Sequence, residues 1–236
     1  MALGNKTLND LVSPISAQLG NARVADKVDM PEWEFKAQRV TDGLSHEQLV
    51  DMFQAEAEKV RVKVSRCSAA DLATCIGDIV REGVPGTGEE CEVVCANDER
   101  FEQAGLYDAL KRRKLVSKVT VWDPEAGDAN VDAALVATYG ITYTTGGIAE
   151  TATVVQPTSA NCGRAISLLP LVHIAVVDAS SIVATMHDVM KGFEESGEKL
   201  PSQVCFISGP SATADIELVR VEGVHGPMYV HYVIVE

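Results

Sequence analysis

Residues 91–122, CEVVCANDERFEQAGLYDALKRRKLVSKVTVW, decide the fold class. The apolar run Glu92–Cys95 predicts a buried strand, the charged segment Glu99–Arg113 predicts a helix, and Lys118–Trp122 predicts a second strand. A strand, a helix and another strand in succession are typical of a parallel sheet. The two cysteines of the first strand fit a buried strand better than a metal site, which needs four ligands when it is structural.

The same alternation extends to both sides of this stretch. Ser45 can cap a helix that runs to Lys59. Further helices are predicted at 71–81, 131–137, 159–169 and 180–195, and further strands at 60–64, 141–145, 148–155, 172–177, 204–207 and 228–235. We therefore predict an α/β fold, with a mainly parallel sheet flanked by helices, in one domain at residues 45–236. Residues 1–44 are predicted to be an N-terminal helical extension, or an arm that reaches a neighbouring subunit of a homo-oligomer.

Composition narrows the classes of partner. The chain has 236 residues, a net charge of −14 and only 5% aromatic residues, which argues against nucleic acid as a ligand because phosphate binding needs clustered Lys and Arg. The first residues lack the apolar core of a signal peptide, and no window reaches the roughly 18 apolar residues of a membrane-spanning helix. These features predict a cytoplasmic location, where the six cysteines would be reduced thiols.

A carboxylate within a run of small residues is the first candidate for a functional group. Glu150 lies in the run 146–155, GGIAETATVV, where the two glycines are expected to form a turn and Glu150 to lie on the strand that follows. A charged group among small and apolar neighbours must be paired, hydrated in a cleft, or held at a shifted pKa. Glu150 is therefore either part of a site or a solvent-facing residue on an edge strand.

Five phrases of the second half stand in a fixed order. They are Gly147–Thr151, Gly163–Arg164 with Ser167–Pro170, Val172–Ile174, Ser208–Ser211 with Thr213–Glu217, and Gly223–Pro227. Together they resemble the LUD domain family and, within it, the lactate utilization protein C group. The resemblance is close over residues 130–236 and extends to residues 45–130 only in the α/β pattern.

The resemblance implies a fold similar to the NagB/RpiA/CoA-transferase-like superfamily. It also implies a component of a system that oxidises L-lactate to pyruvate together with separate iron–sulfur proteins. Three positions depart from the family pattern. Ala212 and Met228 stand where the family often has basic residues, and Ala152 stands where it usually has glycine. The loss of two cations would weaken a phosphate or carboxylate site built there.

The remaining candidates come from loops around these phrases. Gly209, Ser211 and Thr213 follow a predicted strand and precede a predicted turn of helix, where they either cradle an anion or cap the turn. Asp215 either lines the same site or holds the loop through bonds to backbone N–H groups. Arg164 offers a planar fork for a carboxylate or phosphate, or pairs with Asp215, Glu217 or Glu150. The ligand-binding set is completed by Gly147 and Thr151.

Two histidines differ in their surroundings. His225 lies in a glycine-flanked loop, which makes it the candidate acid or base, unless this loop is a tight hairpin turn. His173 opens an apolar strand and is expected to be buried and hydrogen-bonded. With Glu150, His225 forms the predicted catalytic pair.

The sequence leaves three functions open. It contains no phosphate-binding GxxxxGK[ST], no strand-linked GxGxxG, no HExxH and no cysteine run for a cluster, so we expect this chain to bind no cofactor or metal and iron–sulfur clusters to reside on partner proteins. The first reading is a component of a lactate-oxidising system that binds a small carboxylate or phosphate-bearing ligand, or docks partners. The second is a stand-alone CoA-transferase or sugar-phosphate isomerase that uses Glu150. The third is an assembly subunit without chemistry.

Overall fold

The computed structural model describes residues 13–15, 17–20, 38–84, 90–197, 199–214 and 220–236. These divide into two units, Met1–Arg39 and Val40–Glu236. In the first unit the described residues include helical backbone at 13–15 and 17–18. The boundary expected at residue 44 stays a prediction.

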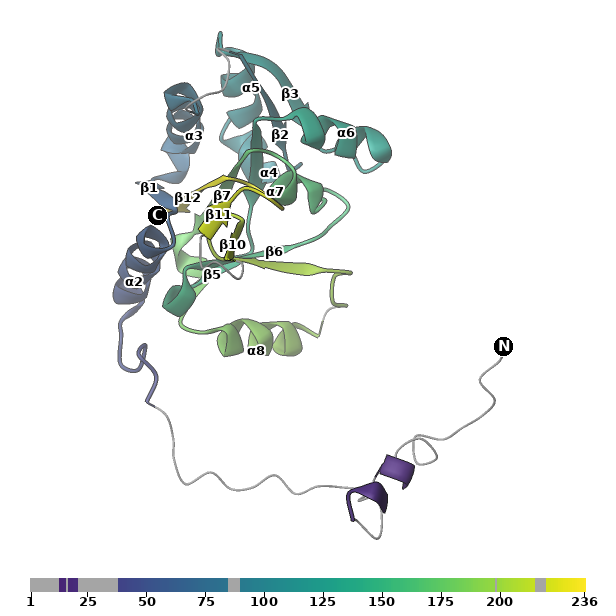
Figure 1. Ribbon diagram of the computed structural model, residues 1–236. Helices are drawn as coiled ribbons and strands as arrows, with labels where there is room; N and C mark the ends of the chain where they lie inside the picture. Colours follow the sequence, from purple (N-terminus) through teal and green to yellow (C-terminus); the bar gives the residue numbers. More distant parts are fainter. Residues whose placement is uncertain (1–12, 16, 21–37, 85–89, 198, 215–219) are drawn as a thin grey trace, which may run out of the picture. The chain divides into compact units, whose positions relative to one another are not determined.

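A six-stranded parallel sheet forms the centre of the second unit (Figure 1). Its order is β1-β12-β7-β4-β2-β3, and every neighbouring pair is parallel. The strands are β1 (Lys63–Cys67), β12 (Tyr229–Val235), β7 (Val172–Asp178), β4 (Tyr139–Tyr143), β2 (Cys91–Cys95) and β3 (Val116–Val121). The middle strands β4 and β7 are buried over nearly their whole length, as expected for a sheet covered on both faces.

Helices cover both faces of this sheet. The chain moves in one direction along the sheet from β2 to β3 and in the other from β3 to β4, and right-handed crossovers then place their helices on opposite faces. One face carries η1 (Ala69–Asp71), α3 (Leu72–Glu82), α4 (Glu99–Gln103) and α5 (Leu106–Lys111), and the other carries α6 (Asp128–Val136) and α7 (Ala165–Leu168). Adjacent residues of β4 contact the helices on opposite faces of the sheet. Tyr139 reaches the Val80 carbonyl of α3, and Gly140 lies against the Ile166 carbonyl of α7.

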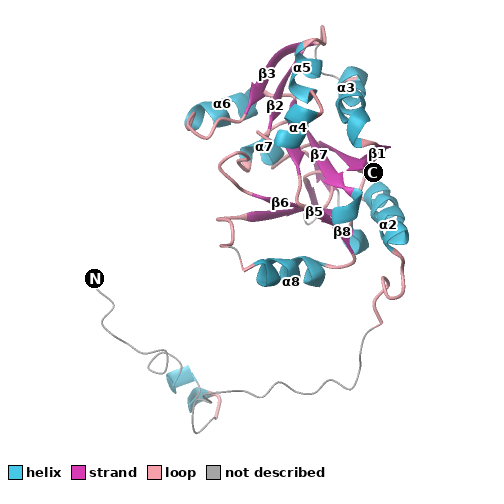
Figure 2. Cartoon of the chain, turned by 180° about the vertical axis from the view of Figure 1, so that it is seen from behind, coloured by secondary structure: helices cyan, strands magenta, loops and turns pink. Residues whose placement is uncertain are grey.

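A second, smaller sheet lies beside the first. Its order is β8-β5-β6-β9, from β8 (Ile182–Val183), β5 (Gly146–Ile148), β6 (Thr153–Pro157) and β9 (Val204–Ile207). Helix α2 (His46–Lys59) contributes to the apolar core that this sheet shares with β7 and β12, where Phe53 stacks on Tyr232 at 5.4 Å. The remaining elements are η2 (Ala149–Thr151), η3 (Ala179–Ser181), α8 (Met186–Ser196), β10 (Ala212–Ala214) and β11 (Arg220–Glu222). Figure 2 shows α8 below the β6–β9 ribbon.

The structure confirms the fold class and several elements. The predicted parallel sheet flanked by helices is present, and α2 begins with the expected cap, since Ser45 and Gln48 form a reciprocal capping box. Cys91 and Cys95 lie in a buried strand, as predicted. No helix in the described part of the chain is both long and apolar enough to cross a membrane.

Four local predictions were wrong, because the chain turns or changes element at other positions than the sequence pattern indicates. The helix expected at 99–113 divides at Gly105, whose φ of 68° ends one helix and begins the next. The helices expected at 159–169 and 180–195 shrink to α7 and α8, because loops and short strands fill their first turns. The double glycine lies in β5, so the turn falls at η2 and places Glu150 there. Thr213 lies in strand β10, and residues 215–219, where the turn of helix is expected, lie outside the described residues.

Candidate functional site at the carboxyl ends of the parallel strands

The direction of the chain along the large sheet reverses between β2 and β4. Ligands of open α/β sheets bind in the crevice at such a reversal, outside the carboxyl ends of the strands. A pocket of about 410 Å³ lies here, lined by residues that follow β2, by the end of β4 and by the end of β6. Its polar lining includes Asn97, Asp98, Arg100, Tyr143, Thr145, Gln156, Asn161 and Cys162. We refer to this pocket as the crevice.

Arg100 organises the crevice. Asp98 caps α4 and accepts two hydrogen bonds from the Arg100 guanidinium, at 2.9 and 2.7 Å. A third guanidinium bond reaches Asp178 at the end of β7, at 3.3 Å. The Arg100 Cζ atom lies 3.5 Å from the centre of the Tyr143 ring, and the Tyr143 hydroxyl donates to Asp178 at 2.5 Å. Four side chains from three strand ends thus form one hydrogen-bonded network.

The network shifts the pKa values of its members. Burial alone would raise the pKa of Asp98, but the hydrogen bonds from Arg100 outweigh burial and lower it. The same bonds raise the pKa of the Arg100 guanidinium. Burial, followed by the hydrogen bond to Asp178, raises the pKa of Tyr143 above its usual range. At neutral pH the network is therefore an ion pair with a protonated phenol beside it.

Gln156 and Cys162 form a neutral, polar wall of the crevice. Gln156 is buried, and its Nε2 donates to the Pro157 carbonyl at 3.2 Å, which identifies the other atom as the carbonyl Oε1. That Oε1 has no hydrogen-bond partner among the described residues. Burial raises the pKa of the Cys162 thiol to about 12, so this cysteine is a weak hydrogen-bond partner and not a thiolate nucleophile.

Arg164 is the predicted site residue that lies next to the crevice. It directly follows Gly163 and the loop that contributes Asn161 and Cys162 to the lining. Its side chain is exposed, and Nη1 donates to the neutral amide oxygen of Gln203 at 2.9 Å. Of the ion pairs expected for Arg164, the one with Glu150 is not formed. Asp215 and Glu217 lie outside the described residues.

Glu150 lies at the other end of the β6–β9 ribbon. The 3-10 turn η2 carries it between β5 and β6, whereas Arg164 follows the opposite end of β6. The Glu150 backbone N–H donates to the Ala184 carbonyl at 3.3 Å, and its side chain is half-buried. No hydrogen bond or ion pair of the carboxylate is recorded with the residues that the structure describes. Gly147 and Thr151 flank the turn.

A chain of hydroxyl groups fills the space beside this turn. Thr151 Oγ1 lies 2.7 Å from Thr153 Oγ1, which lies 2.5 Å from Ser208 Oγ at the end of β9. Gly209 follows, and its N–H donates to the Tyr232 hydroxyl at 3.3 Å. The structure thus brings Gly147, Glu150, Thr151 and Gly209 to one end of the small sheet, without Arg164.

Ser211, Thr213 and His225 lie in the segments that lead from β9 to the amino end of β12. The Ser211 N–H donates to the Pro227 carbonyl at 2.9 Å, and Ser211 accepts from Gly223, so this loop satisfies its own backbone groups. Thr213 pairs with Val221 in the β10–β11 ribbon. His225 is exposed in the loop that leads into the amino end of β12, away from the crevice, and Asp215 lies outside the described residues.

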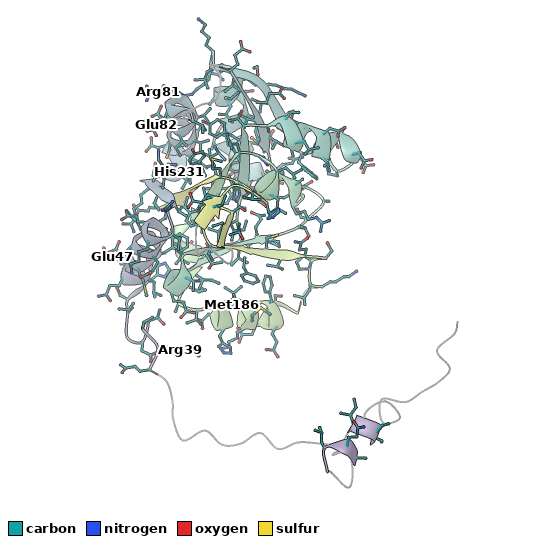
Figure 3. The ribbon with its side chains drawn as sticks, in the orientation of Figure 1. Arg39, Glu47, Arg81, Glu82, Met186 and His231 are labelled. Carbon is teal, nitrogen blue, oxygen red and sulfur yellow. The ribbon has the colours of Figure 1, made fainter. Side chains whose placement is uncertain are left out.

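Two histidines, His173 and His231, are buried in the parallel sheet. His173 is fully buried, and its Nε2 lies 2.9 Å from Thr142 Oγ1, as the sequence predicted. Burial lowers its pKa to about 4, so the ring is neutral at pH 7. His231 meets Ser65 Oγ at 2.9 Å and, with Glu82, lines a pocket of about 230 Å³ at the amino ends of the strands (Figure 3). Among the described residues, no cluster of three His, Cys, Asp or Glu side chains could hold a metal ion.

The crevice network was missed by sequence reasoning. Asp98 and Arg100 follow one predicted strand, Tyr143 belongs to a second and Asp178 follows a third, and none of the four lies in the five phrases. A usable signal was present, because each lies at or just after the carboxyl end of a predicted parallel strand.

This geometry defines a class of protein. It is an α/β protein with a polar crevice at the place where the direction of the chain along the parallel sheet reverses. The profile of the LUD domain matches residues 50–235, and the chain belongs to the LUD domain family.

Its relatives include proteins named lactate utilization protein C. The protein from Halalkalibacterium halodurans is 35% identical over 226 residues, which cover 94% of each chain. The protein from Bacillus subtilis is 34% identical over 94% of this chain and 92% of its own. The one from Oceanobacillus iheyensis is 30% identical over the whole of both. A crystal structure of a DUF162 family protein from Deinococcus radiodurans shares the fold, with a TM-score of 0.52 and 20% identity over 82% of this chain and 99% of that one.

Proposed function

We propose that this protein serves in lactate utilization, as a component that binds a small hydroxy or keto acid and acts with separate iron–sulfur proteins. The observation that carries the proposal is the similarity to lactate utilization protein C, which reaches 35% identity over 94% of this chain. The iron–sulfur partners are what the family resemblance implies, and their clusters would accept the electrons that leave lactate.

The geometry favours the crevice as the place where the acid binds. Asp98 and Asp178 already bond to the single guanidinium of Arg100, and Glu99 also lines the crevice, so the inner crevice is a poor site for a further carboxylate. Three of the five N–H groups of an arginine are used here by the two aspartates, which leaves two that can donate to a hydroxyl or keto oxygen.

The carboxylate of the acid would then be held by Arg164. This side chain is exposed, directly follows the loop that lines the crevice, and bonds only to a neutral amide among the described residues. Its charge is therefore available for a bidentate bond to a carboxylate. Arg164 as carboxylate ligand and Arg100 as hydroxyl ligand make the site specific for a 2-hydroxy or 2-keto acid.

Deletion of the gene tests the cellular role. Cells without it are expected to grow poorly on L-lactate and normally on pyruvate, because pyruvate enters metabolism after the oxidation step. Wild-type protein supplied in trans should restore growth on L-lactate. Equal growth of the deletion strain and the parent on L-lactate would contradict the proposal.

Calorimetry with purified protein tests the site. L-lactate and pyruvate are expected to bind, and Arg164→Gln should weaken binding by about ten-fold or more, since losing a charge-assisted pair costs roughly 1.5–3 kcal/mol. Arg112→Gln is the matched control, because Arg112 is exposed beyond α5 and lines a different hollow. An equal affinity in the wild type and the Arg164 variant would remove Arg164 from the site.

The half-buried carboxylate of Glu150 supports a second candidate. A carboxylate without a recorded partner can act as a nucleophile towards an acyl group or as a base, as the CoA-transferase or isomerase reading requires. Turnover of acyl-CoA or sugar phosphates by purified protein, abolished in Glu150→Gln, is the result that this candidate needs. Absence of turnover in the wild type would leave Glu150 without a catalytic role.

A further inference from the structure

Helix α6 has two apolar faces. Ala133 and Ala134 of this helix are buried against the body of the protein, as any surface helix requires. On the outer side, however, Val131, Leu135 and Val136 are 38%, 60% and 64% exposed. The exposed side of a surface helix normally carries polar and charged residues, so large apolar side chains there are unusual. The outer side of α6 is therefore that of a helix with a missing neighbour.

Helix α7, which is a neighbour of α6, also has exposed leucines at its end. The two helices pack against each other, and Leu168 and Leu169 of α7 are 38% and 40% exposed. We call the five side chains Val131, Leu135, Val136, Leu168 and Leu169 the α6–α7 surface. Figure 1 shows α6 at the outer side of the second unit, beside β2 and β3. Single exposed apolar residues are ordinary, but a group of five on neighbouring helices marks an interaction site.

The α6 part of this surface is acidic, and the nearest basic residue that follows in the sequence is Arg164, which caps α7. Asp128 and Asp132 are exposed on α6 itself, and the chain contains no Lys, Arg or His between Val119 and Gly163. The whole chain has a net charge of −14, so a second copy would meet this surface with repulsion. An anionic lipid surface would be repelled for the same reason, because interfacial helices carry Lys and Arg on their polar face.

We propose that the α6–α7 surface docks a different protein, which offers an apolar groove bordered by Lys or Arg residues. Val131 and Leu135 are four residues apart and point to the same side of the helix, which is the spacing of anchor residues that enter a groove. Asp128 and Asp132 repeat the same spacing and pair with the basic border of the groove. The inference goes beyond the proposed binding of an organic acid, because it assigns a surface on the opposite side of β4 from α3 and away from the crevice.

Site-specific photo-cross-linking identifies the partner. A benzophenone amino acid at position 135, in the full-length chain inside L-lactate-grown cells, is expected to form a cross-link to one other protein, identified by mass spectrometry. Met190 of α8 is 50% exposed and provides the matched control position, where no such product should form. A product formed with another copy of this chain, no product at position 135, or equal products at both positions would each overturn the proposal.

Binding between the two purified proteins decides whether the contact has the proposed chemistry. Leu135→Ala should weaken it by about ten-fold or more, as expected for an anchor residue, and Met190→Ala should leave it unchanged. The affinity should fall with added NaCl, and the pair Asp128→Asn with Asp132→Asn should weaken binding several-fold and flatten that salt dependence. A complex that is insensitive to Leu135→Ala, or a salt dependence that the aspartate variants leave unchanged, would overturn it.

Discussion

The crevice and the η2 turn each contain a carboxylate in an unusual setting, but they differ in how many groups surround it. Asp178 accepts hydrogen bonds from Tyr143 and Arg100, which also holds Asp98. Glu150 lies on a short turn, where backbone contacts fix the chain and its carboxylate has no recorded partner among the described residues. The crevice is a network, and the turn presents a single residue.

The difference teaches where a site can arise. Arg100 and Asp178 are 78 positions apart in sequence, and they meet because parallel strands end at the same edge of a sheet. Glu150 stands out in the sequence because its neighbours are small. In the structure those neighbours form the turn itself. Ala152, for example, ends the turn with φ at 47° and ψ at 44°. The following predictions test this contrast, from the largest expected effect to the smallest.

The largest effect is expected beneath the crevice, where β7 holds His173. Its pKa is lowered from 6.5 to about 4 in the folded protein, so between these values the unfolded chain binds more protons. Stability present above pH 6.5 is therefore lost as pH falls towards 4, by about 3 kcal/mol for this histidine. Urea unfolding at pH 7, 6, 5 and 4 measures the loss.

The variant His173→Gln isolates this contribution, because glutamine can bond to Thr142 without titrating. His231, whose pKa burial and Lys63 also lower to about 4, will keep part of the slope. The slope in the variant should be clearly smaller than in the wild type. Identical slopes would mean that His173 does not remain neutral in the folded protein.

The next effect concerns the loop that lines the crevice. A Cβ atom at Gly163 would lie 2.1 Å from a ring carbon of Trp122, so Gly163→Ala forces the loop or the indole to move. The expected loss is about 1–3 kcal/mol of unfolding free energy, measured by denaturant titration. Gly192→Ala in α8 is the matched control, since its Cβ meets nothing within 4 Å and alanine favours a helix. If Gly163→Ala destabilises the protein no more than Gly192→Ala does, the crevice wall at Gly163 is not rigid.

Matched amide substitutions compare the two carboxylates directly. Asp178→Asn weakens the acceptor for Tyr143 and Arg100 and is expected to lower stability by about 1–2 kcal/mol. Glu150→Gln should change it by less than about 0.5 kcal/mol, the usual range for a surface substitution without a specific partner. Thermal and urea unfolding at pH 7 measure both. Equal losses of stability in the two variants would contradict the contrast between the hydrogen-bonded network of Asp178 and the single carboxylate of Glu150.

The smallest effect is expected for Ala152→Gly. The left-handed conformation costs an alanine roughly 1–2 kcal/mol, which glycine avoids. Glycine also loses the buried methyl group, worth about 0.8 kcal/mol, and adds freedom to the unfolded chain. These contributions offset, so stability should change by less than about 0.5 kcal/mol in urea unfolding. A loss above about 2 kcal/mol would mean that the methyl packing outweighs the strain.

Much of the fold could be predicted because strand and helix patterns are local. The run Glu92–Cys95 and the capped helix after Ser45 both appear as expected, since burial of alternate residues and a capping box act within a few positions. The errors fall where glycine or a loop redirects the chain. Gly105 divides a helix that its flanking residues favour, and the double glycine pairs in β5 where a turn was expected.

The candidate site was predictable only in part. Arg164 lies next to the crevice, but Glu150 lies on the η2 turn and His225 in the loop before β12, and no pattern in the sequence shows how these places are arranged. The residues that fill the crevice could have been proposed from the strand ends. Which strand ends lie next to each other depends on the order of the strands in the sheet. That order is set by pairing between strands that are far apart in sequence.

By itself the sequence determined an α/β domain with a mainly parallel sheet, its family and the acidic character of its surface, because periodicity, phrase order and charge are properties of the chain. Only the tertiary structure decided that β4 lies between β2 and β7. That order brings Arg100, Tyr143 and Asp178 together and leaves Glu150 on a distant turn. The physical reason is that side chains interact over a few ångströms in space, and the sheet, with its crossovers, determines which distant residues come that close.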